Sequence, residues 1–222
     1  MAGEATKRKL IEVTYRILQE KGFENLKARE IAKEAGCTAT VIYKYFDNLN
    51  YLIVLASLCV LEEYNRESLE ISKKTGDCIT LNKMAWRAFI RHAFKNPHIF
   101  ENLFWGKGKA VFEDAVIEYF ELYPEELSGK TSAYYYATYF NSNLEERDFI
   151  WLRRGVNEGY LELEDAMYIS RVNSMIVHGM LLEHMDDYTI PGVAEKAIKE
   201  CIYLVEKNIN TFLKVYPEGM CE

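Results

Sequence analysis

Hydrophobic residues recur with the period of an α-helix along most of the chain. In residues 6–21, for example, Leu10, Ile17 and Leu18 fall on one face and charged side chains occupy the other. Glycines such as Gly22 and Gly36 interrupt the pattern where helices are expected to end. Further helices are predicted over residues 28–35, 38–45, 50–74, 79–95, 97–105, 109–123, 131–142, 144–158, 163–185 and 192–216.

One segment of this pattern is ambiguous. The run TSAYYYATYF at residues 131–140 is rich in Tyr and Thr, which favour strands. No other stretch is a candidate strand that could pair with it, so a helix is the remaining interpretation. The predicted fold class is therefore all-α.

Residues 27–52 have the layout of a helix-turn-helix motif. Two short helices are joined by a tight turn at Gly36, and the helix at residues 6–21 precedes them as a support. The apolar positions expected to hold the three helices together are Leu10, Thr14, Ile17, Ile31, Ala32, Ala35, Ile42 and Phe46. The predicted N-terminal domain is thus a three-helix, homeodomain-like unit.

The second short helix, residues 38–45, leaves a polar face for the outside. Small residues at its start let a backbone approach closely, and hydroxyl groups can meet base edges or phosphates in a DNA major groove. The outward residues are Thr38, Ala39, Thr40, Tyr43, Lys44 and Tyr45. Spacing alone leaves two interpretations open, namely a DNA-binding face and an ordinary solvated surface.

The net charge of −7 opposes DNA binding, but its distribution along the chain is uneven. Residues 1–52 contain nine Lys and Arg and seven Asp and Glu, a balance of +2. The remaining residues contain 18 and 27, a balance of −9. Because charges beyond about 8 Å are screened at physiological salt, a mildly basic head can meet DNA despite an acidic body.

The first 52 residues resemble the N-terminal domain of TetR-family transcriptional regulators. The matching stretches are LIEVTYRILQEKGFENL, REIAKEAGC and TATVIYKYFDNLNYL, and the IYKYF element followed by a short linker and Leu is the most specific. The resemblance covers about a quarter of the chain. Beyond it, the chain agrees with the family only in length and helical character.

The resemblance implies roles for individual residues of the motif. It implies base contacts from Ala39, Thr40 and Tyr43, phosphate contacts from Thr38, Lys44 and Tyr45, and a base or phosphate contact from Arg29.

Two positions depart from the family pattern. Lys27 stands where Ser or Thr usually forms a capping box with an acid, here Glu30. Leu49 stands where a lysine usually touches phosphate. We therefore expect weaker phosphate affinity, or compensation by Lys27 and Lys44.

The middle of the chain is rich in aromatic residues, which suits a largely apolar ligand pocket of the kind that TetR-like regulators carry. The candidate ligand-binding residues are Trp86, Phe89, His92, Phe104, Trp105, Tyr135, Tyr139, Trp151 and His178. Ordinary core packing is the alternative, and for each single aromatic it is the more favoured. His92 and His178 lie among apolar residues, where a hydrogen-bonded core histidine is also the more common case.

The last two predicted helices carry more apolar surface than one core can cover. The stretch MIVHGMLLEHM is apolar nearly all round, and residues 192–216 carry a broad apolar stripe. TetR-like proteins form a four-helix dimer interface at this position. The candidate interface residues are Met175, Gly179, Leu182, Ala197, Cys201, Leu204 and Phe212. Burial within the monomer is the alternative, but too much of this surface is apolar for that to suffice.

Other chemistry finds no support in the sequence. Five scattered cysteines, never spaced CxxC, fit a reducing cytoplasm and argue against a disulfide framework or a zinc site. The apolar runs are much shorter than the ~20 residues that span a bilayer, and no membrane partner is expected. We found no nucleotide-binding or nucleophile motif, so we expect no catalytic residues, no metal and no cofactor.

The sequence thus predicts a cytoplasmic, ligand-responsive repressor. Its expected partners are a double-stranded DNA operator of palindromic sequence, a second copy of the chain as a homodimer, and an unidentified small-molecule effector that releases the DNA. Residues 1–49 would bind DNA, and residues 50–222 would bind ligand and dimerise. The alternative is an all-helical ligand-binding or interaction protein whose DNA binding is weak or vestigial.

Overall fold

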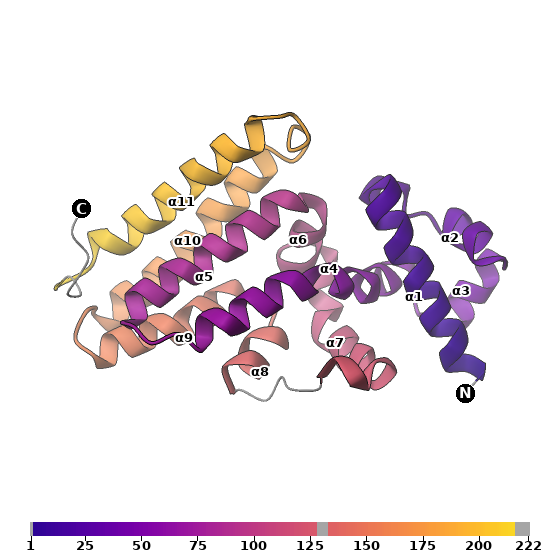
Figure 1. The fold of residues 1–222 in the computed structure, drawn as a ribbon, viewed down its shortest axis with the longest axis horizontal. Helices are drawn as coiled ribbons and strands as arrows, with labels where there is room; N and C mark the ends of the chain where they lie inside the picture. The colour runs from indigo at the N-terminus through magenta and orange to yellow at the C-terminus, as the bar shows by residue number, and fades with distance from the viewer. Residues whose placement is uncertain (1, 128–132, 216–222) are drawn as a thin grey trace. The chain divides into compact units, whose positions relative to one another are not determined.

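A computed structural model describes residues 2–127 and 133–215. The described residues form helices and no strand, so the predicted all-α class is confirmed (Figure 1). The α-helices are α1 (Ala2–Lys21), α2 (Ala28–Ala35), α3 (Ala39–Tyr45), α4 (Leu49–Ser72), α5 (Cys78–Lys95), α6 (Pro97–Phe104), α7 (Phe112–Leu122), α8 (Ala133–Tyr139), α9 (Leu144–Asn157), α10 (Leu163–Glu183) and α11 (Val193–Thr211). Three short 3-10 helices connect them, namely η1 (Phe23–Asn25), η2 (Lys107–Val111) and η3 (Pro124–Leu127).

The predicted helices differ from the observed ones at several ends. The ambiguous tyrosine-rich run is helical as α8, although residues 131 and 132 lie outside the described part. The prediction of an α-helix from residue 109 is wrong in its first turn, because the chain there is the 3-10 helix η2. The Gly108 amide donates to the Asn102 side chain at 3.1 Å, a tertiary contact that the helical pattern could not reveal.

The chain divides into two compact units. The first unit consists of Met1–Glu63 and Asn102–Ser142, and the second of Tyr64–Glu101 and Asn143–Glu222. The helix-turn-helix lies entirely in the first unit, which also includes the start of α4 and all of α7. These units are defined by packing, so the functional boundary expected at residue 49 remains a prediction.

The interior of the first unit is apolar where the sequence predicts it. Each of the eight residues expected to join α1, α2 and α3 is buried, with exposed fractions of at most 4%. Leu52 and Leu55 of α4 and Phe112 and Tyr119 of α7 are also buried. The three N-terminal helices are therefore held by the face that the hydrophobic pattern identifies.

The second unit contains a buried polar network that the sequence analysis missed. Asp148 of α9 accepts hydrogen bonds from Trp86 Nε1 at 2.7 Å, from the Asn82 amide, and from Asn173 Nδ2 at 3.4 Å. Asn173 in turn accepts from Asn208 Nδ2 at 2.9 Å, so helices α5, α9, α10 and α11 are all joined. Burial raises the pKa of Asp148 to about 6, although its hydrogen bonds oppose the shift.

The apolar segments of the described chain are not suited to crossing a bilayer as single helices. Only α3 and α4 taken jointly have the required length and hydropathy, and a bend of 78° separates them.

Candidate nucleic-acid interface

The turn between α2 and α3 is set by a glycine and two backbone hydrogen bonds. Gly36 adopts the left-handed conformation with φ of 68°, which a glycine takes at little steric cost. Its amide donates to the Lys33 carbonyl at 3.1 Å, and the Cys37 amide donates to the Ala32 carbonyl at 2.9 Å. This Schellman motif ends α2 as predicted and directs the chain into α3.

Helix α1 supports the motif from behind. Glu34 of α2 pairs with Lys21 at 3.0 Å and with Arg16 at 3.6 Å, both on α1. Such exposed pairs contribute little free energy, so it is mainly the buried apolar contacts that hold α1 and α2 together.

The exposed face of α3 carries the residues expected to contact DNA. Tyr43 is 54% exposed, and Thr38, Thr40 and Lys44 are exposed as well. Ala39 and Tyr45 are half-buried, and Arg29 is exposed on α2. The Tyr45 ring lies 3.6 Å from the point where a Cβ on Gly3 would stand, so this side chain also packs against the start of α1.

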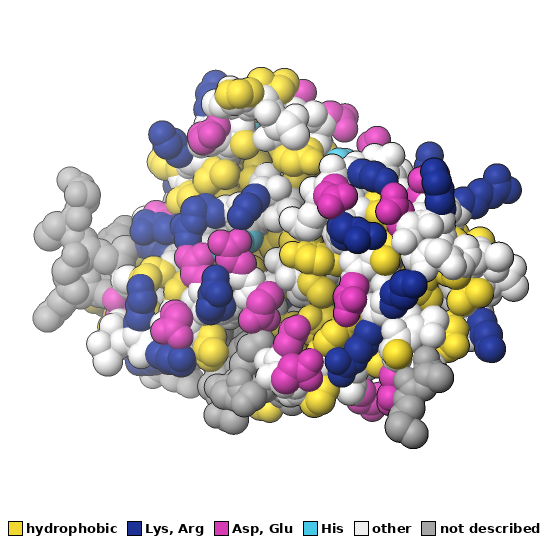
Figure 2. All heavy atoms as spheres, turned by 45° about the vertical axis from the view of Figure 1, so that its right-hand side comes forward, with side chains coloured by type: hydrophobic (Ala, Val, Ile, Leu, Met, Phe, Trp, Pro, Cys, Tyr) yellow, Lys and Arg dark blue, Asp and Glu magenta, His cyan; other side chains and the backbone are white. Residues whose placement is uncertain are grey.

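Basic side chains near α3 differ from those of α1 in their partners. Lys7 pairs with Glu118, and Arg8 donates to the Leu122 carbonyl and lies 4.8 Å from the Tyr123 ring. By contrast, Lys27 and Arg29 form no ion pair with any residue that the structure describes. Figure 2 shows basic and acidic side chains intermingled over the visible face of the molecule. Lys27 and Arg29, at the start of α2, are exposed and available to phosphate.

The two departures from the family pattern have structural counterparts. Lys27 is the N-cap residue of α2 and makes no side-chain capping bond, as expected. Thr38 occupies the N-cap position of α3, but its side chain makes no capping hydrogen bond either. Leu49 is the first residue of α4 and is half-buried. Asn48, which the sequence analysis overlooked, caps α4 by accepting from the Tyr51 amide at 2.9 Å.

The aromatic residues proposed for a ligand pocket are divided between the two units. Phe104 and Tyr139 are buried and Trp105 is half-buried in the first unit, whereas the side chain of Tyr135 lies outside the described part. In the second unit Trp86, Phe89, His92 and Trp151 are buried, and His178 is half-buried. The Phe89 ring packs edge-on against those of Trp86, Tyr64 and Phe100, with centroids 5.3 to 5.8 Å apart. Within each unit these contacts are those of a packed aromatic core.

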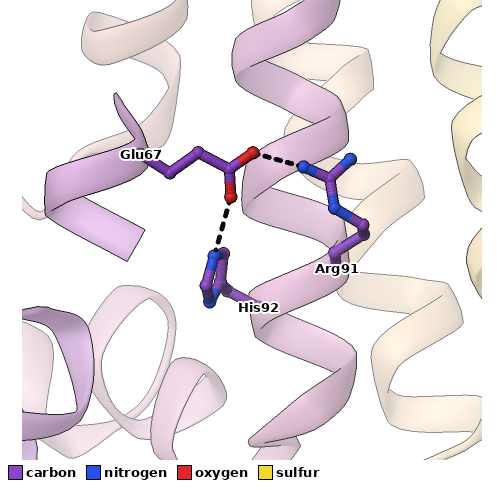
Figure 3. A network of polar contacts seen from close by, with 3 residues as sticks. All are labelled: Glu67, Arg91 and His92. Atoms are coloured by element: carbon purple, nitrogen blue, oxygen red, sulfur yellow. Dashed lines mark hydrogen bonds and ion pairs between the residues drawn. The ribbon is translucent and has the colours of Figure 1, made fainter. Parts of the chain in front are cut away.

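His92 has a defined polar partner. Its Nε2 lies 3.0 Å from a carboxylate oxygen of Glu67, and the other oxygen of that carboxylate faces Arg91 (Figure 3). Glu67 belongs to α4, and Arg91 and His92 belong to α5. The contact favours the interpretation of His92 as a hydrogen-bonded core histidine.

The residues proposed for a dimer interface fall into two groups. Met175 is 64% and Leu182 is 49% exposed, Gly179 is exposed, and Leu204 and Phe212 are half-buried. Ala197 and Cys201 are buried within the chain, because they face inward from α11. Those two side chains therefore support the helix from inside and offer no surface to a partner. Figure 1 shows α10 and α11 side by side.

Comparison with known proteins shows what the N-terminal helices of this chain resemble. Residues 10–52, which contain the helix-turn-helix, match the family of bacterial regulatory proteins described as the tetR family. The N-terminal helix-turn-helix of this chain is thus similar to that of the tetR family of bacterial regulatory proteins. This is a family of regulators and not of enzymes.

Solved structures extend the likeness of fold to nearly the whole chain. A TetR transcription regulator from Haloarcula marismortui is 16% identical, with a TM-score of 0.59, covering 95% of this chain and 99% of that one. FadR from Thermus thermophilus, a TetR-family repressor solved with lauroyl-CoA, is 12% identical, with a TM-score of 0.57 and coverages of 97% and 98%. RolR, solved with resorcinol, is 14% identical, with a TM-score of 0.58 and coverages of 98% and 97%.

Proposed function

We propose that this protein is a repressor that binds a palindromic DNA operator as a homodimer and is released by a small-molecule effector. Two copies of α3 would enter successive major grooves roughly 34–36 Å apart. The observation that carries the proposal is the exposed polar face of α3, held on a closed apolar core and flanked by unpaired Lys27 and Arg29.

The surface of α10 supports dimerisation. Met175 and Leu182 are exposed to solvent within the protomer, and a Cβ at Gly179 would meet no atom within 4 Å. Alanine is favoured over glycine inside a helix by roughly 1 kcal/mol, so the protomer alone gives no reason for Gly179. Close approach of a second helix supplies that reason.

Two proteins of similar fold support the proposal of an effector by analogy. FadR and RolR are similar in fold to this chain and were solved with lauroyl-CoA and with resorcinol, respectively. We expect an effector to displace α4, which contributes residues to both compact units, and so to change the spacing of the two α3 helices. Such coupling is reciprocal, so operator DNA must weaken effector binding by the same factor.

Titration of the full-length protein with DNA from its own upstream region tests the proposal. Tyr43→Ala and Thr40→Ala should each weaken operator binding by about 1–3 kcal/mol and leave random DNA nearly unaffected, because both residues are proposed to contact bases. Lys44→Ala should weaken both and lower the salt slope by about 1. Tyr136→Ala, at another exposed tyrosine, is the control. Unchanged operator binding by Tyr43→Ala would overturn the assignment of α3.

Leu49→Lys separates the proposal from a protein with vestigial DNA binding. If the leucine only removes a phosphate contact, the lysine should add about one counterion to the salt slope and tighten binding without changing sequence preference. If neither the native protein nor this variant distinguishes upstream DNA from random DNA, the protein is a ligand-binding or interaction protein instead.

A further inference from the structure

Helix α7 turns one charged and apolar face outward. Asp114, Ile117, Glu118 and Glu121 follow the i, i+3, i+4, i+7 spacing that places residues on one side of a helix. The opposite side holds the buried residues of α7, such as Tyr119. Ile117 is nevertheless 51% exposed, although isoleucine is among the residue types most often buried.

This face lines a hollow of about 660 Å³, which we call the α1–α7 groove. The other walls are the first turns of α1, including Gly3 and Lys7, and the Tyr45 side chain at the end of α3. The volume lies within the range of small-molecule sites. A smaller hollow of about 290 Å³, which shares Glu4 and Glu121, adjoins the groove.

The charge of the groove is unbalanced toward the negative. Its lysine, Lys7, pairs with Glu118, which also accepts a hydrogen bond from the Tyr51 hydroxyl at 2.8 Å. Asp114 and Glu121 form neither an ion pair nor a hydrogen bond with any other described residue. Two carboxylates thus remain uncompensated beside an exposed isoleucine and a tyrosine ring.

A metal ion does not fit this arrangement. Nowhere in the described part of the chain do three or more His, Cys, Asp or Glu side chains converge closely enough to hold one. The carboxylates are spread along an elongated surface with an apolar and an aromatic wall. Aromatic faces and carboxylates both attract cations, and the apolar wall favours a hydrocarbon body.

We propose that the α1–α7 groove binds an organic cation, namely an ammonium or amidinium group attached to an apolar ring or chain. Its charge lies between Asp114 and Glu121, and its apolar body covers Ile117 and the edge of Tyr45. This site lies within the first unit and includes none of the aromatic residues considered for an effector pocket.

Occupancy of the groove affects the DNA-contacting helix directly, because Tyr45 belongs to α3. An occupant touches α3 and α7 at once and so favours one position of α3 over others. Operator DNA and the organic cation must then change each other's affinity by the same factor. This step rests on the proposed function, whereas binding of the cation does not.

Titration with three small probes of matched shape tests the binding. Benzamidine, benzamide and benzoate carry charges of +1, 0 and −1 on the same ring, and the Ile117 δ-methyl group reports their binding by methyl NMR of the full-length protein. We expect a saturable shift of that methyl with benzamidine in the millimolar range usual for so small a ligand, and none with the other two. A shift with benzamide equal to that with benzamidine, or no shift with benzamidine, would overturn the proposal.

Charge variants then localise the site. Asp114→Asn combined with Glu121→Gln should weaken benzamidine binding about tenfold and remove most of its salt dependence, because both carboxylates are exposed to screening. Glu113→Gln removes the same kind of charge from α7 outside the groove and should leave binding unchanged. Equal binding by the double variant and the native protein would contradict the site.

The coupling to DNA has its own measurement. Operator affinity measured with and without saturating benzamidine should differ in the native protein and agree in the Asp114→Asn, Glu121→Gln variant. If benzamidine binds in the groove but the protein binds no DNA, the proposed function fails and the site stands. If DNA binds and benzamidine does not, only the site fails.

Discussion

The two compact units differ in what they do with large hydrophobic side chains. Among the described residues, three exposed ones lie in the first unit, at Tyr43, Ile117 and Tyr136, and nine lie in the second. The second set includes Met167 and Met175 of α10. The N-terminal helices cover their own apolar residues, whereas α10 leaves a large share of its own uncovered.

The surfaces of the two units therefore suit different kinds of partner. A polar exposed face on a closed core suits a partner that is polar and charged, such as DNA. An extended apolar face suits a partner that buries it, such as a second copy of the same helix.

Gly179→Arg should have the largest effect. It places an unpaired charge on the apolar face of α10, and burying that charge against a partner would cost several kcal/mol. Sedimentation velocity should show a dimer for the native protein and a monomer for the variant, and operator affinity should collapse in the variant. Since a Cβ at Gly179 meets nothing in the protomer, circular dichroism should show unchanged helix content. If the native protein sediments as a monomer at micromolar concentration, both the proposed interface and the proposed palindromic operator are contradicted.

Asp148→Asn should change how stability depends on pH. The pKa of Asp148 is raised by burial to about 6 from an ordinary value of 3.8, so between these values the unfolded chain releases a proton that the folded chain keeps. The free energy of unfolding therefore falls as pH rises through this window, by on the order of 3 kcal/mol in total. Asp148→Asn should not show this fall. Urea unfolding of both proteins at several pH values measures the difference. Glu145→Gln, an exposed change on the same helix, should leave the native pH dependence in place.

Gly108→Ala should destabilise the first unit by about 1–3 kcal/mol. The added Cβ would stand 2.7 Å from the Asn102 carbonyl oxygen and 2.9 Å from Val54 Cγ2, and the backbone cannot easily move. Gly155→Ala in the second unit is the matched comparison, because its nearest neighbour is the flexible end of Ile79 at 3.2 Å. Thermal unfolding should rank Gly108→Ala well below Gly155→Ala, and equal melting temperatures would contradict the packing described for η2.

Lys27→Ser should have the smallest effect, a stabilisation of about 1 kcal/mol. Serine at this N-cap position can accept from the backbone amide of Glu30, and Glu30 can complete the capping box. Lys33→Ser within α2 removes the same charge without creating a cap and should not stabilise. Chemical unfolding distinguishes the two variants. If Lys27 contacts phosphate, Lys27→Ser should also lower the salt slope measured in DNA titrations.

The sequence was most informative where local pattern and burial agree. The period of apolar residues identified the buried face of α1, α2 and α3, including Leu10, Ile31 and Phe46, because a helix buries one face wherever it packs. The Gly36 turn was also predictable, since left-handed backbone favours glycine.

Other features depend on contacts between residues far apart in the chain. Asp148 has the composition of a surface residue, and only its partners Asn82, Trp86 and Asn173 explain its burial. Likewise, no local pattern could pair Lys7 with Glu118, which lie 111 positions apart. The polar interior of the second unit and the groove beside α1 therefore required the structure.

The two methionines on the open face of α10 give that face a chemical vulnerability. Met167 is 59% and Met175 is 64% exposed in the protomer, so both thioethers are accessible to peroxide. Oxidation to the sulfoxide turns a flexible apolar side chain into a polar one. Separated chains would thus accumulate sulfoxides on α10, the surface through which we propose that two chains associate. Mild oxidants would then convert a reversible separation of the chains into a lasting one.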